Sequence, residues 1–207
     1  ITIVTDETKL GLKDEFDFEF PGTGDVIPIK YHEINITSQK TLNFDGRDEN
    51  GKKVVTKDDD GNYYLNYSVT LNNPTSLDTL SFHDAVGGKQ KYDGAVTISG
   101  ANKAVQVNPS VSSTSNGQEF TIDIKSALGI NGNDLVPAGT YTVTYRTKLT
   151  DADLKSIDDN AEVAAETNKA DWTTTGGKKI IPNDITVEVR KAMSGTAASS
   201  AITIRPS

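Results

Sequence analysis

The sequence predicts an all-β protein built as an antiparallel β-sandwich. Short runs rich in Val, Ile, Thr, Tyr and Phe alternate apolar with polar residues, which is the period-two pattern of half-buried strands. Turns containing Gly, Pro, Asn and Asp separate these runs, and helical periodicity is almost absent. Hydrophobic residues make up 35% of the 207 residues, which suits the thin core of a sandwich better than a thick α/β core.

The expected strands follow one another along most of the chain. The first ends at Pro21-Gly22, and later turns fall at residues 58–62, 72–75 and 137–139. In order, strands are expected at residues 16–20, 29–44, 54–55, 63–71, 77–86, 95–98, 104–107, 120–124, 140–149, 162–172, 185–189 and 201–204. One or two helical turns are expected from Thr150, where a capping pattern precedes Leu154 and Ile157.

We expect one core domain over residues 29–179. The flanks, residues 1–28 and 180–207, could add edge strands to this sandwich or belong to neighbouring domains. The Ala-, Ser- and Gly-rich residues 193–200 are expected to form a flexible loop. Because the chain begins with Ile1 rather than Met, we expect it to be a piece of a longer protein, with any secretion or anchoring signal outside it.

Charge and composition exclude several classes of function. The net charge of −8 argues against nucleic-acid binding, which requires basic patches. Cysteine is absent, so disulfides, thiolate metal sites and cysteine nucleophiles are excluded. No apolar run is long enough to span a membrane and no basic amphipathic segment is present, so no membrane contact is expected from this fragment.

A lysine lies on the apolar face of an expected strand. Reading alternate residues from 34 to 44 places Lys40 on one face with Ile34, Ile36, Leu42 and Phe44. A buried ammonium is costly unless it is paired, neutralised or consumed by chemistry. Lys40 is therefore the most informative residue of the sequence.

Two further polar residues break the apolar pattern of their strands. Asp84 shares a face with Leu80, Phe82 and Val86. Asn168 shares a face with neighbours that include Ala164, Ala170 and Trp172. A Lys, an Asp and an Asn that point inward from three strands suggest an amide cross-link between the side chains of Lys40 and Asn168, within a core formed by Leu80, Phe82 and Trp172.

The chemistry of such a link assigns a role to each residue. Burial would neutralise the Lys40 amine and make it nucleophilic. Burial would also raise the pKa of Asp84, so that its protonated form could donate a hydrogen bond to the Asn168 side-chain oxygen and pass a proton to the departing ammonia. The reaction needs no cofactor and runs once per chain, so it is not enzymatic turnover. Two alternatives need no link. Lys40 could extend past its neighbours to water, and Asp84 or Asn168 could simply form hydrogen bonds with a turn.

Five stretches of the chain resemble one known family. They are residues 39–41, residues 67–73, the Ser81-Phe82-His83-Asp84 segment, residues 141–150 and residues 167–172, with a Trp four residues after Asn168. Together they resemble the collagen-adhesin-type (Cna-like) immunoglobulin-like domain of Gram-positive surface adhesins and pilus-associated proteins. The resemblance covers roughly residues 34–175.

The resemblance implies an immunoglobulin-like sandwich in which a Lys on the first strand bonds to an Asn on the last, assisted by an Asp on a middle strand. Lys40, Asn168 and Asp84 occupy those positions. It further implies an extracellular, cell-wall-anchored protein whose partners are neighbouring domains and a host protein or glycan. The glutamate-bearing box of pilin shaft domains is missing, so a polymerising pilin is not expected.

Other groups of carboxylates and histidines are typical of turns and exposed surface. Asp45 and Asp48, and separately Asp58 and Asp60, are weak candidates for calcium ligands, but neither group fits the twelve-residue calcium loop, and no metal is expected. His32 and His83 are expected to be exposed and not to form a zinc pair.

Three functions follow from the sequence. The first is a structural or adhesive module stabilised by the Lys40–Asn168 isopeptide bond. The second is a ligand-binding head of the same kind of surface protein, which a long apolar groove would favour. The third is a surface hydrolase, although the chain has no Gly-x-Ser-x-Gly elbow and a charged turn is more often solvated surface.

Overall fold

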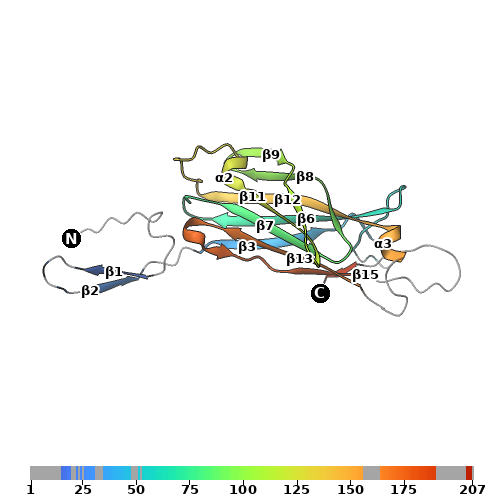
Figure 1. Ribbon diagram of the computed structural model, residues 1–207, viewed down its shortest axis with the longest axis horizontal. Coiled ribbons are helices and arrows are strands. Elements are labelled where there is room, and N and C mark those ends of the chain that lie inside the picture. Colours follow the sequence, from blue (N-terminus) through green and yellow to red (C-terminus); the bar gives the residue numbers. More distant parts are fainter. Residues whose placement is uncertain are drawn as a thin grey trace.

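A computed structural model describes residues 15–19, 22, 24, 26–30, 35–47, 51, 53–155, 164–189 and 204–206. Two antiparallel sheets face each other across one hydrophobic core (Figure 1). This architecture confirms the predicted all-β, immunoglobulin-like antiparallel sandwich. Among the described residues, no helix has the length and apolar character needed to cross a membrane.

The first sheet has five strands in the order β3-β6-β12-β8-β9. Their bounds are β3 (Thr37–Asn43), β6 (Asn62–Asn73), β8 (Lys91–Gly100), β9 (Lys103–Val107) and β12 (Gly139–Thr150). β3 lies at one edge, and the long strands β6 and β12 pair in register over their whole length. The first sheet therefore carries Lys40 on an edge strand.

The second sheet contains seven strands. The path β10-β11-β7-β13-β15-β16 is joined by β14, which pairs with β13. Their bounds are β7 (Ser81–Gly87), β10 (Val111–Ser113), β11 (Gly117–Asp123), β13 (Ala164–Thr173), β14 (Lys179–Ile180), β15 (Ile185–Val189) and β16 (Ile204–Pro206). Because β15 and β16 belong to this sheet, part of the C-terminal flank adds strands to the sandwich.

Two hairpins and three short helices complete the described elements. β1 (Glu15–Glu19) pairs with β2 (Val26–Lys30), and β4 (Gly46–Arg47) pairs with β5 (Lys53–Val54). The helices are α2 (Ile124–Ala127), α3 (Asp151–Lys155) and the 3₁₀ turn η1 (Thr175–Gly177). The helical turn expected after Thr150 is thus confirmed.

Several expected strand bounds were wrong. The strand expected over residues 29–44 is divided, because β2 pairs in a separate hairpin whereas β3 joins the five-stranded sheet. The strand expected from residue 77 begins at Ser81, and Leu77 makes only an isolated bridge to Val136. The strand expected to reach residue 124 ends at Asp123, because the Asp123 side chain accepts a hydrogen bond from the Ser126 N–H at 3.0 Å and caps α2. The loop expected over residues 193–200 lies outside the described residues.

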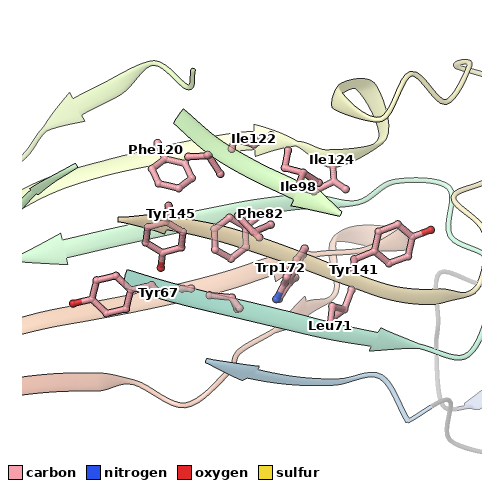
Figure 2. Packing of buried hydrophobic residues seen from close by; sticks show 14 of the residues in the cluster. Tyr67, Leu71, Phe82, Ile98, Phe120, Ile122, Ile124, Tyr141, Tyr145 and Trp172 are labelled. Atoms are coloured by element: carbon pink, nitrogen blue, oxygen red, sulfur yellow. The ribbon is translucent and has the colours of Figure 1, made fainter. Parts of the chain in front are cut away.

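Alternate residues of the inner strands fill the core. On β6 every second side chain from Tyr63 to Leu71 is at most 1% exposed, as the period-two pattern predicts. Aromatic rings from both sheets meet in the middle of this core (Figure 2). Phe82 of β7 lies 4.8 Å from Trp172 and 6.2 Å from Tyr145 of the opposite sheet, measured between ring centroids. Such tilted contacts contribute beyond the apolar area that they bury.

Strands β7 and β11 pair closely where Gly117 lies opposite Gly87. A Cβ atom at Gly117 would lie 1.8 Å from the Val86 carbonyl oxygen and 3.0 Å from the Gly87 Cα. Only glycine therefore fits at this position without movement of the β7 backbone.

We expect Gly117→Ala to lower the free energy of unfolding by about 1–3 kcal/mol, the usual cost of overpacking a rigid site. Gly132→Ala is the control, because a Cβ there meets nothing within 4 Å. It should change stability by less than about 0.5 kcal/mol. Urea unfolding followed by Trp172 fluorescence measures both, and equal stability of the two variants would contradict the close approach.

Candidate site of an intramolecular cross-link

Lys40 is held inside the sandwich. It is the one buried residue of β3 and is 2% exposed. The side chain of Asn183 bonds the backbone of Lys40 itself. It accepts a hydrogen bond from the Lys40 N–H at 2.9 Å and donates one to the Lys40 carbonyl at 3.0 Å. The Lys40 ammonium therefore does not extend to water. This excludes the alternative in which Lys40 extends past its neighbours to solvent.

The three polar residues meet in the core. β7 and β13 pair so that Asp84 lies opposite Ala170 and Asn168 lies opposite Val86, which brings the two side chains to the same face of the second sheet. Lys40 reaches them from the first sheet. Its Nζ lies 2.5 Å from Asn168 Oδ1 and 3.8 Å from Asp84 Oδ2, and Asp84 and Asn168 are both 0% exposed.

Two tyrosine hydroxyls complete the site. Tyr92 of β8 donates to Asp84 Oδ1 at 2.6 Å, and Tyr145 of β12 donates to Asp84 Oδ2. The Tyr145 hydroxyl also bonds the Asn168 side chain, at 3.1 Å from Nδ2 and 3.3 Å from Oδ1. Neither residue could be predicted from the sequence, because an aromatic residue in an alternating strand is ordinarily part of the core.

Burial disfavours the charged forms of both Lys40 and Asp84. Burial lowers the pKa of the Lys40 ammonium to about 8, although the charge of Asp84 opposes this shift. Burial raises the pKa of the Asp84 carboxyl to about 6, against the opposing effects of Lys40 and of the hydroxyls of Tyr145 and Tyr92. These shifts bring the two pKa values closer together than those of a lysine and an aspartic acid in water, so moving a proton from Lys40 to Asp84 costs less free energy here than in water.

Burial and the neighbouring Asp84 charge also raise the pKa of Tyr145 well above its usual value. Its hydroxyl therefore keeps its proton at neutral pH. Tyr145 remains available as a hydrogen-bond donor between Asp84 and Asn168.

A second layer of buried polar groups fixes the strand that carries Asn168. Glu166, 1% exposed, accepts the Lys89 N–H at 2.8 and 3.0 Å and the Gln90 N–H at 2.9 Å. The Gln90 side chain donates to the Thr167 carbonyl at 2.9 Å. Burial raises the pKa of Glu166, while the backbone N–H groups of Lys89 and Gln90 oppose the shift. In the sequence, the one signal that could have predicted this close packing against Glu166 is the Gly87-Gly88 pair.

The expected apolar surroundings are present. Leu80, Phe82 and Trp172 are each at most 1% exposed. The Trp172 indole N–H donates to the Ser38 hydroxyl at 2.9 Å, and this bond joins the two sheets two residues from Lys40. Lys40, Asp84 and Asn168 thus lie between two sheets that are also held together by packing and by a hydrogen bond.

This arrangement places an amine against the carboxamide that it could attack. Contact of this kind replaces a bimolecular encounter by an effective molarity of about 10⁵ M or more. The Asp84 carboxyl lies 3.8 Å from the Lys40 Nζ, and the Tyr145 hydroxyl bonds both Asp84 and the Asn168 side chain, so groups that can transfer protons contact each partner.

The turn carboxylates have structural roles. Asp45 accepts the Thr56 N–H at 2.7 Å, and Asp58 accepts the N–H groups of Asp60 and Asn62 at 3.0 and 2.7 Å. Asp48 and His32 lie outside the described residues. In the described part of the chain, no group of three or more His, Cys, Asp or Glu side chains is arranged to hold a metal.

His83 is about one-third exposed on the outer face of the second sheet. Its Nδ1 lies 3.0 Å from Asp171 Oδ2, and its Nε2 lies 3.5 Å from Glu119. These are contacts between side chains on neighbouring strands, as expected for a residue opposite the apolar face.

A cavity of about 420 Å³ lies between β7, β11 and α2. Its lining includes Asp78, Asp123 and Lys125. Asp123 caps α2, and the Lys125 ammonium bonds the carbonyls of Asp78 and Gly132 at 2.9 and 3.0 Å. The Asp123 carboxylate and the Lys125 ammonium therefore stabilise the local fold.

No protein-family model matches the chain, and no curated protein matches it in sequence. Among solved structures, the full-length major pilin SpaD from Corynebacterium diphtheriae is 11% identical over 74% of the chain, with a TM-score of 0.47. The N-terminal domain of the Streptococcus gordonii adhesin Sgo0707 is 9% identical over 78% of the chain, also at 0.47. The collagen-binding domain of a Staphylococcus aureus adhesin is 12% identical over 74% of the chain, at 0.38.

The chain spans 34% of the SpaD pilin, 34% of the Sgo0707 structure and 97% of the collagen-binding domain. In fold, the chain is similar to domains of Gram-positive pilins and surface adhesins.

Proposed function

We propose that the chain is a structural or adhesive module of a bacterial cell-surface adhesin or pilus protein, stabilised by an autocatalytic isopeptide bond between Lys40 and Asn168. One observation carries the proposal: a fully buried lysine Nζ lies 2.5 Å from a buried carboxamide oxygen, with a carboxyl group 3.8 Å away. The module acts outside the cell, next to neighbouring domains of its own protein and within reach of a host protein or glycan.

The reaction exchanges one C–N bond for another. The neutral Lys40 Nζ attacks the Asn168 Cγ, a Cγ–Nζ bond forms, the Cγ–Nδ2 bond breaks and ammonia leaves. Asp84 supplies the proton that ammonia needs and recovers one from the Lys40 nitrogen. Atoms and protons balance without cofactor or oxidant, so the reaction can occur as soon as the sheets assemble.

The position of the link explains its use. It joins an edge strand of one sheet to an inner strand of the other, over 128 residues of sequence. By analogy with a disulfide that closes a long loop, such a link stabilises the folded state by about 5 kcal/mol. A covalent bond between the sheets also prevents a pulling force from separating them, which suits a protein exposed to shear.

The described surface favours the structural module over a ligand-binding head. Its exposed large hydrophobic side chains are Val111, Leu135 and Ile181, on three separate segments. Isolated apolar residues of this kind are ordinary on a protein surface. These three side chains do not form a long apolar groove of the kind that would indicate a head.

Intact-mass measurement of the purified chain tests the link. We expect the wild-type chain to have the sequence mass less one ammonia, and Lys40→Ala to have its full calculated mass. Lys40→Met is the matched control for stability, because it keeps the side-chain volume without a nucleophile. Both variants should unfold at least about 10 °C below the wild type and be cut faster by trypsin. An unaltered wild-type mass would remove the proposal.

Asp84→Ala tests the role of the carboxyl group. The variant keeps both partners, yet we expect it to retain its ammonia, because the carboxylic acid that supplies the proton for the leaving ammonia is gone. Asp84→Asn keeps the side-chain size and is expected to behave in the same way. If either variant folds and still loses ammonia at the wild-type rate, the assigned role of Asp84 is wrong.

The rate of cross-linking should depend on pH in a bell-shaped manner. The reactive pair is neutral Lys40 with protonated Asp84, whose pKa values are about 8 and about 6. Below pH 6 the neutral amine declines about tenfold per pH unit, and above pH 8 the protonated acid declines equally, so the rate should be highest between these values. Unlinked chain from inclusion bodies, refolded from urea at several pH values and followed by mass, gives the profile. A rate that rises steadily to pH 10 would show that Asp84 need not be protonated.

A further inference from the structure

The hydroxyl of Tyr145 lies between the carboxyl of Asp84 and the carboxamide of Asn168. We propose that Tyr145 is a catalytic residue of the cross-linking reaction, which carries the proton from Asp84 to the amide nitrogen that leaves as ammonia. This inference rests on the proposed function, because it assigns a step within the reaction that joins Lys40 to Asn168.

The contacts of the site indicate this route. Asp84 Oδ2 is bonded by Tyr145 and Asp84 Oδ1 is bonded by Tyr92 at 2.6 Å, so hydroxyl groups occupy both carboxyl oxygens. The Tyr145 oxygen lies 3.1 Å from Asn168 Nδ2, the atom that must be protonated. Among the described residues, it is the one hydroxyl with a hydrogen bond to both Asp84 and Asn168.

Tyr145 is also placed to act on the carbonyl. Its oxygen lies 3.3 Å from Asn168 Oδ1, where negative charge develops as Lys40 attacks. A donor fixed at this point stabilises the developing oxyanion without reorganisation. The same hydroxyl can therefore polarise the carbonyl first and protonate the leaving nitrogen afterwards.

The proton transfers balance in three movements. Protonated Asp84 donates its hydrogen bond to the Tyr145 oxygen, so the Tyr145 hydroxyl is free to donate to Oδ1 while Lys40 Nζ bonds to Asn168 Cγ. As the Cγ–Nδ2 bond breaks, the Tyr145 hydroxyl proton passes to Nδ2 and the Asp84 carboxyl proton passes to the Tyr145 oxygen. A proton from the Lys40 nitrogen then returns to Asp84 Oδ2, which lies 3.8 Å from Nζ at the start. Tyr145 and Asp84 end as they began, and ammonia is released.

The surrounding core holds the hydroxyl in place. Tyr145 is 5% exposed, and its ring stacks on Tyr67 at 5.4 Å and meets the edge of Phe120 at 5.6 Å (Figure 2). Packing on both sides limits the ring to small movements. At this depth a hydroxyl supplied by the protein replaces the water that would carry protons at an exposed site.

Tyr145→Phe and Tyr92→Phe form a matched pair. Each removes one hydroxyl from Asp84 and leaves a phenyl ring in the core, but only Tyr145 also touches Asn168. Both variants are refolded from urea as unlinked chains beside the wild type, with Trp172 fluorescence to follow folding and intact mass to follow ammonia loss. We expect Tyr145→Phe to cross-link at least about 100-fold more slowly than the wild type, and Tyr92→Phe to stay within about tenfold.

The outcomes separate this inference from the proposed function. If the wild type loses no ammonia, the link and the inference both fail. If the wild type is linked and Tyr145→Phe is linked at the same rate, the link stands and the role of Tyr145 is overturned. Equal slowing in both variants would also overturn it, because the hydroxyls would then act only through Asp84.

A second measurement covers the case in which Tyr145→Phe does not fold. Fluorotyrosine in place of Tyr145 keeps the ring and the hydroxyl but makes the hydroxyl more acidic. Because a relay transfers this proton during the reaction, the cross-linking rate should change at least about twofold. An unchanged rate in the folded, fluorinated chain would contradict the proposal.

Discussion

The site depends on the cost of holding a lysine amine away from water. Lys40 lies on an edge strand, where a long side chain would ordinarily reach solvent, yet it is turned inward and is buried. An unpaired ammonium in such a place would destabilise the fold by several kcal/mol. The structure meets this cost with a short contact to Asn168 and a charged partner in Asp84. The same desolvation that makes the group expensive also makes it a nucleophile, so the cost of burial and the proposed reactivity have one cause.

The arrangement of the two sheets makes this contact possible. Asn168 and Asp84 come from adjacent strands of one sheet, whereas Lys40, Tyr92 and Tyr145 come from the other. The site therefore forms only when the sheets pack, and its groups have no reason to meet in the unfolded chain. Supporting contacts act on the backbone rather than on these side chains. The Asn183 side chain holds the backbone of Lys40 at the sheet edge, and the buried Glu166 carboxylate fixes the strand of Asn168. Rigid support on both sides is what proximity catalysis requires.

The sequence predicted most of the strands because burial on one face leaves a period-two pattern. It failed where the pattern does not distinguish between local alternatives. Residues 29–44 read as one long strand, but pairing partners, which lie far away in the sequence, divide the segment between a hairpin and the main sheet. The predicted strand ran past Asp123 to residue 124, because the sequence does not distinguish an Asp that caps a helix from an Asp on the face of a strand.

The sequence by itself determined the sandwich class and the three polar residues that break its apolar faces, because a polar residue in an apolar stripe is a local anomaly. Only the tertiary structure decided that Lys40, Asp84 and Asn168 lie in contact, since their strands are distant in sequence and the sheets could have packed in another register. It alone placed Tyr92 and Tyr145 at the carboxyl group. A tyrosine in a strand satisfies the hydrophobic pattern through its ring, and the destination of its hydroxyl depends on which strands lie across the core.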